Sequence, residues 1–211
     1  MSGLRRLFRG ARLIDPDSGR DTTGDIIVVD DRIAAIGHDI HAEGLGADVE
    51  VVECGGLCLA PGLVDMRVQL REPGAEHIES IESGGQAAAA GRVATMAARP
   101  NTEPPDDDVS VVEFLARRGR EARLAKIHTY AAATKGRKGK ELTEIGLLAA
   151  NGAVGFTDGV KAIADALVMR RVLSYARTFD QLVVQHPEEP SLGGAGEVTE
   201  GEIATRLGLS G

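Results

Sequence analysis

The fold is decided by the stretch AKIHTYAAATKGRKGKELTEIGLLAANGAVGFTD at residues 125–158. It opens with an apolar run of strand length at 125–132 and passes through a basic loop at 134–140 into a helical pattern at 141–152, which Gly152 ends. It closes with a second apolar run at 153–158. A strand, a helix and a second strand in this order predict two parallel strands joined by a crossover helix. The stretch therefore indicates a parallel sheet with helices packed on it.

The same rhythm continues on both sides of this stretch. In the helix predicted at 108–122, Val111, Val112 and Leu115 share one face. Five strand and helix repeats with near-continuous apolar strands indicate a parallel sheet covered by helices. The further predicted strands are at 63–70, 93–98 and 181–186, and the further predicted helices are at 77–91 and 164–176.

The first sixty residues have a different pattern, in which short β-like runs alternate with turn residues. Asp30 and Asp31 lie between two apolar runs, as the turn of a hairpin does. Such short strands need another layer to pack on. We therefore expect a small β domain at residues 1–60, followed by the strand and helix repeats at 61–211.

An open doubly wound sheet and a barrel both produce this repeat, so the loops must distinguish them. Neither G-x-G-x-x-G after the first repeat strand nor G-x-x-x-x-G-K-[ST] is present, which removes the usual signatures of nucleotide-binding open sheets. Polar groups that converge from the carboxyl ends of separate strands are typical of a (β/α)8 barrel. The sequence therefore predicts an α/β fold with about five units of a TIM-type barrel. The polar residues that follow the predicted strands are Arg67, Gln69, Arg71, Asn101, Asp158 and His186.

Composition argues against nucleic-acid binding. The 211 residues are 43% hydrophobic and 27% charged, as in an ordinary globular protein. The formal charge of −8 and the aromatic content of 3% are unsuited to holding phosphates or stacking bases. One basic cluster occurs, and we expect it to be a solvated loop rather than an anion site. It consists of Lys135, Arg137, Lys138 and Lys140.

The sequence also argues against a membrane protein and a disulfide scaffold. No window approaches the roughly 20 apolar residues of a membrane span. Cys54 and Cys58 are the only cysteines, and no further Cys or His nearby completes a zinc motif, so we expect them to act as small apolar fillers. A reducing cytoplasm is the expected compartment.

The residues after the strands resemble a bacterial dihydroorotase of the cyclic amidohydrolase superfamily. Six segments match in the order in which the family has them, and together they span roughly the whole chain. The segments are APGLVDMRVQLREPG at 60–74, ESGGQAAAAG at 82–91, RPNTEPPDD at 99–107, TKGRKGKELTEIG at 134–146, GAVGFTDG at 152–159 and QHPEEPSL at 185–192.

The resemblance implies a barrel with one or two zinc ions at its mouth. A metal-held hydroxide attacks the ring amide of dihydroorotate, or carbamoyl aspartate closes in the reverse direction, while an Asp after the eighth strand moves the proton. An Arg after the first strand and an Asn after the second hold the substrate carboxylate, and the matching residues here are Arg71 and Asn101. Alternatively, Arg71 is a residue of the barrel mouth that pairs with Glu72 or another acidic neighbour, and Asn101 stabilises a turn by bonding its own backbone.

The metal ligands that the resemblance implies are mostly replaced. The family's His-x-His reads Arg67-Val68-Gln69 here, and a protonated guanidinium cannot ligate zinc. The family's F-[ST]-D-D-G, aligned without a gap, leaves Gly159 at the position of the bridging Asp, although a shift of one residue would let Asp158 serve. His186 is the clear survivor, either as a ligand or as a residue held by a hydrogen bond.

The resemblance thus implies a degenerate dihydroorotase homologue of pyrimidine biosynthesis, inactive and with zinc absent or weakly bound. Such a protein would assemble with aspartate transcarbamoylase catalytic chains, in a homo- or hetero-oligomer. One alternative is an active dihydroorotase, or a related zinc cyclic amidase, that rebuilds its site from Asp158, His186 and residues beyond Gly211. Another is a module that holds a small dicarboxylate through Arg71 and Asn101 without metal.

A complete barrel of this kind takes about 250 residues. On this interpretation strands six to eight, a further His ligand and the catalytic Asp lie outside the 211 residues, so we expect either that the sequence is a fragment of a longer protein or that a partner covers the opening. An arc of five strands would expose two sheet edges and an apolar interior, where association is expected.

Overall fold

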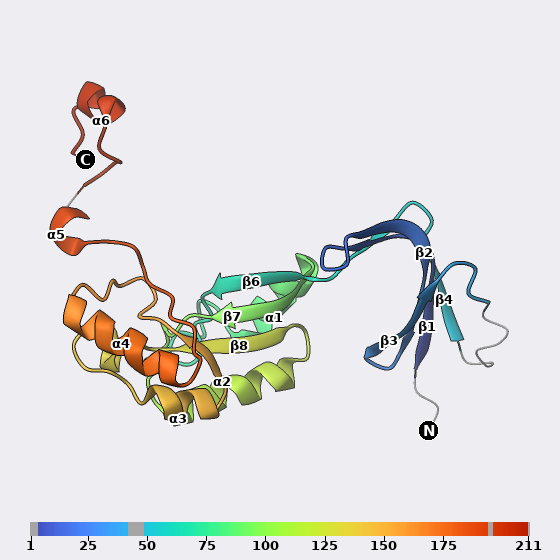
Figure 1. The fold of residues 1–211 in the computed structure, drawn as a ribbon, viewed down its shortest axis with the longest axis horizontal. Helices are drawn as coiled ribbons and strands as arrows, with labels where there is room; N and C mark the ends of the chain where they lie inside the picture. The colour runs from blue at the N-terminus through green and yellow to red at the C-terminus, as the bar shows by residue number, and fades with distance from the viewer. Residues whose placement is uncertain (1–3, 42–48, 194–195, 211) are drawn as a thin grey trace. The chain divides into compact units, whose positions relative to one another are not determined.

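The computed structural model of the protein describes residues 4–41, 49–193 and 196–210. The chain divides into two compact units, Met1–Gly62 and Leu63–Gly211, which we name the β unit and the barrel unit. Each has its own sheet (Figure 1).

The β unit is a sheet in the order β3-β2-β1-β4, with β5 also paired to β1. β1 pairs antiparallel with β2, which pairs antiparallel with β3, whereas β4 and β5 run parallel to β1. The predicted hairpin turn is confirmed, because Val29 pairs with Arg32 and Asp30 has a φ of 55°. Cys54 is buried as expected, but Cys58 is exposed. The strands are β1 Arg5–Asp15, β2 Arg20–Val29, β3 Arg32–Gly37, β4 Val49–Glu53 and β5 Cys58–Leu59.

The barrel unit contains a sheet of four parallel strands in the order β6-β7-β8-β9. The sequence predicted all four and the main helices between them. The fifth predicted strand, at 181–186, makes a single parallel bridge from Val183 to Phe156. The strands are β6 Leu63–Val68, β7 Val93–Ala98, β8 Lys126–Ala131 and β9 Ala153–Phe156. The helices are α1 Ile81–Ala90, α2 Val109–Ala122, the 3-10 turn η2 Lys135–Arg137, α3 Ile145–Ala150, α4 Ala166–Thr178, α5 Pro190–Gly193 and α6 Glu202–Leu207.

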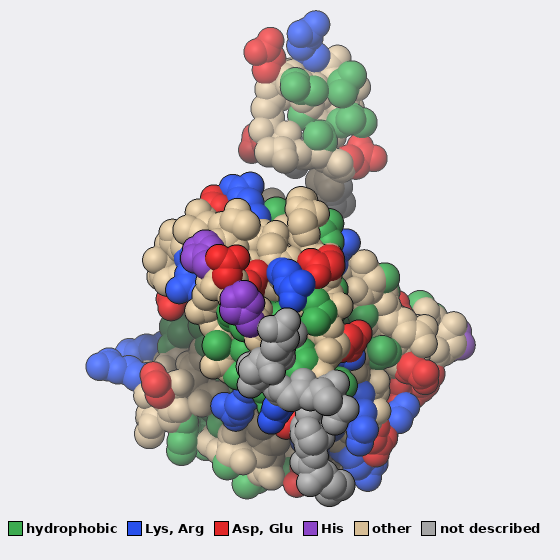
Figure 2. Space-filling model, turned by 90° about the vertical axis from the view of Figure 1, so that its right-hand side faces the viewer, with side chains coloured by type: hydrophobic (Ala, Val, Ile, Leu, Met, Phe, Trp, Pro, Cys, Tyr) green, Lys and Arg blue, Asp and Glu red, His purple; other side chains and the backbone are tan. Residues whose placement is uncertain are grey.

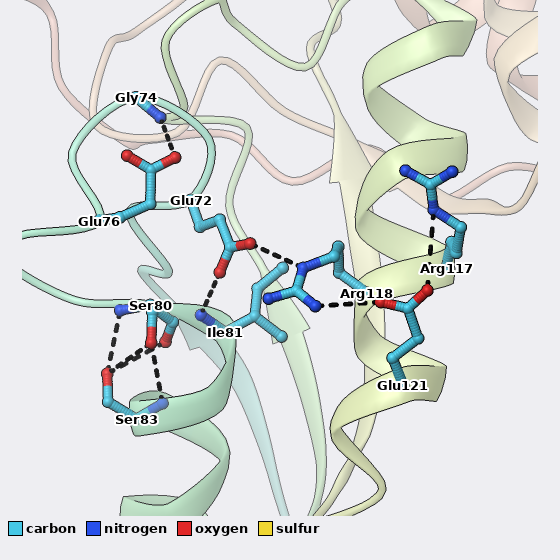
Figure 3. Close-up of polar contacts among 9 residues, drawn as sticks. All are labelled: Glu72, Gly74, Glu76, Ser80, Ile81, Ser83, Arg117, Arg118 and Glu121. Carbon is cyan, nitrogen blue, oxygen red and sulfur yellow. Dashed lines mark hydrogen bonds and ion pairs between the residues drawn. The ribbon is translucent and has the colours of Figure 1, made fainter.

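Polar side chains fix where three of the helices begin. Asp108 accepts a hydrogen bond from the backbone N of Ser110 at 2.9 Å and starts α2. Asp165 starts α4 by accepting from two backbone N–H groups. At α1, Ser80 and Ser83 form a reciprocal capping box, drawn in Figure 3. Each cap satisfies backbone donors that the first turn of a helix leaves without partners.

The core of the barrel unit lies where the helices cover the sheet. Helices α2, α3 and α4 lie along one face of it (Figure 1), and Val112, Leu148, Phe156 and Val172 are at most 1% exposed there. Strand β6 is an edge strand, and its Leu63 is 61% exposed.

The surface shows no segregation of charge on the face drawn in Figure 2, where acidic and basic side chains lie among scattered hydrophobic ones. No helix in the described part of the chain has the length and apolar character needed to cross a bilayer.

Candidate functional site

The predicted site residues lie at one edge of the barrel sheet. Because the four strands are parallel, their carboxyl ends share that edge, where barrels of this type place their chemistry. Residues from all four strand ends gather there: Arg67 in β6 with Gln69 and Arg71 after it, Arg99 and Asn101 after β7, Arg137 after β8, and Asp158 and Gly159 after β9.

Arg99 ties the end of β7 to the end of β6. Its Nη2 donates to the Oε1 of Gln69 at 2.5 Å, and its backbone N donates to the carbonyl of Val68 at 2.9 Å. The amide oxygen at a position where the resemblance implies a zinc ligand is therefore bonded to a guanidinium. Arg99 is not among the predicted site residues, although its place directly after the predicted strand at 93–98 is a usable signal.

Three further arginines surround Arg99, and the four together are named the arginine rim: Arg67, Arg71, Arg99 and Arg137. Burial lowers the pKa of Arg99, and the positive charges of the other three lower it further. Within the described ranges no member of the rim forms an ion pair. The edge is therefore cationic where a divalent cation would have to bind.

Arg137 differs from the rest of the basic loop. Lys135, Lys138 and Lys140 are exposed as the sequence predicted, and Lys135 pairs with Glu141. Arg137 is only partly exposed, and its Nε is buried without a hydrogen-bond partner. The prediction of a solvated loop therefore holds for the lysines and not for Arg137.

Gly159 lies directly against Asn101. Its φ is 74°, and a Cβ added there would lie 2.2 Å from the Oδ1 of Asn101, so an aspartate at 159 would require Asn101 to move. That Oδ1 is buried and has no hydrogen-bond partner. If Asn101 stabilised a turn, its side chain would bond to the backbone nearby. No such bond is found in the described part of the chain.

Asp158 holds a loop in place. It is 1% exposed and accepts hydrogen bonds from the backbone N of Thr134 at 2.9 Å and from the Thr134 hydroxyl. Burial raises the pKa of Asp158, against the effect of these bonds and of Arg137. Both carboxylate oxygens are engaged, so a role as metal ligand would require Asp158 to release Thr134.

His186 follows the single bridge between Val183 and β9. Its Nε2 lies 2.8 Å from the Oε2 of Glu188. This contact matches the interpretation of His186 as a hydrogen-bonded residue, and a metal at Nε2 would have to displace Glu188.

Glu72 anchors the segment that contains Arg71. It is 6% exposed, and its carboxylate accepts from the Nε of Arg118 at 2.8 Å and from the backbone N of Ile81 at 2.9 Å (Figure 3). The carboxylate therefore connects this segment to α1 and α2. Glu72 is not paired with Arg71, so the proposed alternative role for Arg71 is not seen.

The residues at this edge do not fit a zinc ion. A zinc site takes three or four ligands from Cys, His, Asp and Glu. No group of three or more such residues with suitable geometry occurs in residues 4–41, 49–193 and 196–210. A cationic rim would also repel the ion.

A separate cavity lies at the opposite, amino edge of the sheet, with a volume of about 730 Å³. Its lining includes Gly119, Arg120, Lys126 and His128, and none of the predicted site residues. In a barrel this edge usually serves stability rather than chemistry.

Comparisons with known proteins agree with this architecture. A family model described as dihydro-orotase-like matches residues 56–211. The chain is 40% identical over 208 residues to a dihydroorotase of Syntrophotalea carbinolica and 41% identical over 208 residues to one of Pelobacter propionicus. In each case the match covers 99% of this chain and 48% of the relative, so the chain spans about half their length.

Solved structures give the same fold. An L-hydantoinase (dihydropyrimidinase) from Arthrobacter aurescens matches with a TM-score of 0.58 and 25% identity, over 74% of this chain and 33% of its own. A D-hydantoinase matches with a TM-score of 0.69 and 18% identity, over 88% of this chain and 40% of its own, and shows the fold alone. The described strands and helices are therefore part of an amidohydrolase barrel with its small β domain.

Proposed function

This chain belongs to the dihydroorotase-like family, and from that membership we propose that it is a non-catalytic dihydroorotase homologue of pyrimidine biosynthesis. We further propose that it assembles with the catalytic chains of aspartate transcarbamoylase.

The hydrogen bond between Arg99 and Gln69 is the observation that supports the loss of catalysis. It joins a cation to a position where the family's motif has a zinc-binding histidine, and Arg67 adds a second cation at the other such position. Water that is not bound to a cation keeps a pKa of about 15.7 rather than about 7, so it supplies almost no hydroxide at neutral pH. Without that nucleophile the ring amide is not attacked.

The retained fold and core of the family support the assembly role. It is 40% identical to the relative from Syntrophotalea carbinolica over 99% of its own length, and its core is closely packed. Its departures from the family's motifs lie at metal positions, while the segment that holds Arg71 stays anchored through Glu72. A retained scaffold with an altered site suits a protein that acts through its surface.

Two measurements on the full-length protein test the loss of catalysis. Elemental analysis after purification in zinc-containing buffer should find far less than one zinc per chain, and a carbamoyl aspartate cyclisation assay should find no turnover above the protein-free rate. The dihydroorotase of Syntrophotalea carbinolica serves as the positive control. Stoichiometric zinc together with turnover would refute the proposal.

A separate experiment tests the assembly role. The full-length protein is mixed with aspartate transcarbamoylase catalytic chains from the same organism and analysed by size-exclusion chromatography with light scattering. We expect one co-eluting complex. Separate elution at micromolar concentrations would remove the assembly role without bearing on the loss of catalysis.

The names of the relatives favour a second candidate, an active dihydroorotase or related zinc cyclic amidase. Such an enzyme would build its site from Asp158, His186 and residues beyond Gly211. It predicts that Arg67→His combined with Gln69→His changes an activity that the parent protein already has. A parent protein without activity eliminates this candidate.

A further inference from the structure

The cavity at the amino edge of the barrel sheet is separate from the candidate site. It is lined mainly by the end of α2, the first residues of β8 and the turn between them. Its volume of about 730 Å³ is in the range that small-molecule sites in proteins have. No predicted site residue lines it, and neither of the roles proposed for this chain uses it.

One part of the cavity lining is apolar. Leu115 and Gly119 of α2 are buried, and Ile127 of β8 is a partly buried residue packed against the same core cluster as Leu115. A Cβ added to Gly119 would lie 2.9 Å from the Cβ of Ile127, so the helix and the strand are in close contact here. Ala94 and Ala116 also line the cavity, and their side chains are too small to fill it. An apolar group of a ligand would therefore contact apolar side chains.

The rest of the lining is mostly basic. Arg120 lies in the last turn of α2, and Arg123 is the residue that caps the end of this helix. Lys126 and His128 are two residues apart in β8, so they lie on the same side of the strand. All four residues are exposed, and in the described part of the chain none of them forms an ion pair. No Asp or Glu is among the described residues that line the cavity, although the chain has 32 acidic and 24 basic residues.

Balancing the dipole of α2 does not account for this much positive charge. The carbonyl groups at the end of a helix amount to roughly half a negative charge. Arg120, Arg123 and Lys126 each carry a full positive charge, and His128 adds another when it is protonated. Like charges that lie close together repel one another unless an anion joins them. Arg123 also has a φ of 52°, at a position where helices usually have glycine, so the backbone conformation does not explain the arginine.

We propose that this cavity is a binding site for a small organic anion that has an apolar part. Arg120, Arg123 and Lys126 bind the anionic group, and Ala116 and Ile127 contact the apolar part. Carboxylates and phosphates share the anionic chemistry, because both present oxygens that accept charge-assisted hydrogen bonds. The inference rests on neither the loss of catalysis nor the assembly role, so its failure would leave both proposals as they stand.

The experiment is isothermal titration calorimetry on the full-length protein at neutral pH and physiological ionic strength, where exposed charges more than about 8 Å apart are largely screened. The probes share one ring system: 1-naphthyl phosphate and 1-naphthoate carry the two kinds of anionic group, and 1-naphthol is their neutral counterpart. Inorganic phosphate is the anion without a ring. We expect one of the two naphthyl anions to bind saturably and at least about tenfold tighter than both 1-naphthol and inorganic phosphate. The tighter naphthyl anion identifies the class, and equal affinity for 1-naphthol or no binding of either anion would overturn the inference.

Two variants with the same chemical change connect binding to the cavity. Arg123→Gly removes the guanidinium and places glycine at a left-handed position, so it should weaken binding of the tighter naphthyl anion about fivefold or more without lowering the unfolding temperature. Arg92→Gly makes the same exchange at an exposed residue with a φ of 62° that does not line the cavity. This control should change the affinity by less than about twofold, because its charge is screened. Equal effects of the two variants would contradict the proposed site.

A further pair of variants tests the apolar part without changing the charge. Ala116→Leu extends a larger side chain from the cavity lining and keeps a good helix former, so it should weaken binding of the naphthyl anion about fivefold or more. Ala87→Leu makes the same change at an exposed position in α1 outside the lining and should leave the affinity unchanged. Undiminished binding by Ala116→Leu together with weakened binding by Arg123→Gly would place the anion on the open surface and reject the cavity as its site.

Discussion

Replacing Asp106 by asparagine should stabilise the barrel unit at alkaline pH and much less at acidic pH. Asp106 lies in the loop after β7 and is 0% exposed. Its Oδ2 accepts a hydrogen bond from the Thr129 hydroxyl at 2.5 Å, whereas its Oδ1 is buried without a partner. Burial raises the pKa of Asp106 to about 7, against the effect of the Thr129 bond, and the nearby Asp107 carboxylate raises it further.

The size of the effect follows from the two protonation equilibria. The pKa is 3.8 without burial and about 7 in the folded chain, so the folded state binds the proton more tightly. The stabilisation by this proton is fully present below pH 3.8 and is lost as the pH rises through about 7. At about 1.4 kcal/mol per pH unit, ionisation of Asp106 lowers the free energy of unfolding by roughly 2 kcal/mol at pH 5 and by roughly 4 kcal/mol at pH 8.

The assay is urea unfolding followed by circular dichroism at 222 nm. All described helices lie in the barrel unit, so this signal reports its unfolding. Asparagine keeps the shape and an acceptor for Thr129 while removing the charge, so the gain in stability from Asp106→Asn should be about 2–3 kcal/mol larger at pH 8 than at pH 5. The control Asp31→Asn removes a charge from an exposed turn and should show no such difference. Equal effects of Asp106→Asn at both pH values would refute a raised pKa.

Three further predictions use the same unfolding assay. Glu72→Ala should lower the free energy of unfolding by about 2–3 kcal/mol, because it removes a buried carboxylate that accepts two hydrogen bonds. Glu121 is an exposed partner of the same Arg118, so Glu121→Ala should lower that free energy by less than about 1 kcal/mol. Leu148→Ala should cost about 2–5 kcal/mol because the side chain is 1% exposed, whereas Leu147→Ala, 55% exposed, should change stability by less than about 1 kcal/mol. Gly159→Ala should cost about 1–3 kcal/mol because of its positive φ and the close amide oxygen. Equal losses within either matched pair, or an unaffected Gly159→Ala, would contradict the packing described.

Periodicity predicted the barrel strands because each contains an apolar run of strand length, and strands that are neighbours along the chain are also neighbours in the sheet. Periodicity predicted a fifth strand at 181–186, but only Val183 forms a bridge there, to Phe156. Its partner β9 is only four residues long and leaves room for few pairs. The helix predicted from residue 141 is shorter in the structure, where it starts at Ile145. There Thr143 donates to the carbonyl of Ala132 and Leu142 bridges Thr134, so the segment is held by the loop after β8 and the helix begins at Ile145.

The site was harder to predict than the fold, because its contacts join residues far apart in sequence. The position after each strand indicated which polar side chains reach the shared edge. The sequence does not show that Arg99 binds Gln69, 30 residues away, or that Arg137 is partly buried. These contacts depend on the side-by-side placement of β6, β7 and β8, which only the folded chain establishes.

Two departures from the family's ligand positions are each in contact with another residue of the site. Gln69 is bonded by Arg99, and Gly159 leaves the space into which Oδ1 of Asn101 fits. Returning histidine to positions 67 and 69 alone would therefore leave a guanidinium beside the new imidazoles and no carboxylate at 159. The Arg99 guanidinium would repel a zinc ion, and position 159 supplies no carboxylate to bind it. A zinc centre at this edge would therefore also require the replacement of Arg99 and the displacement of Asn101. The altered positions therefore form one connected arrangement, and no single substitution would restore a zinc centre to it.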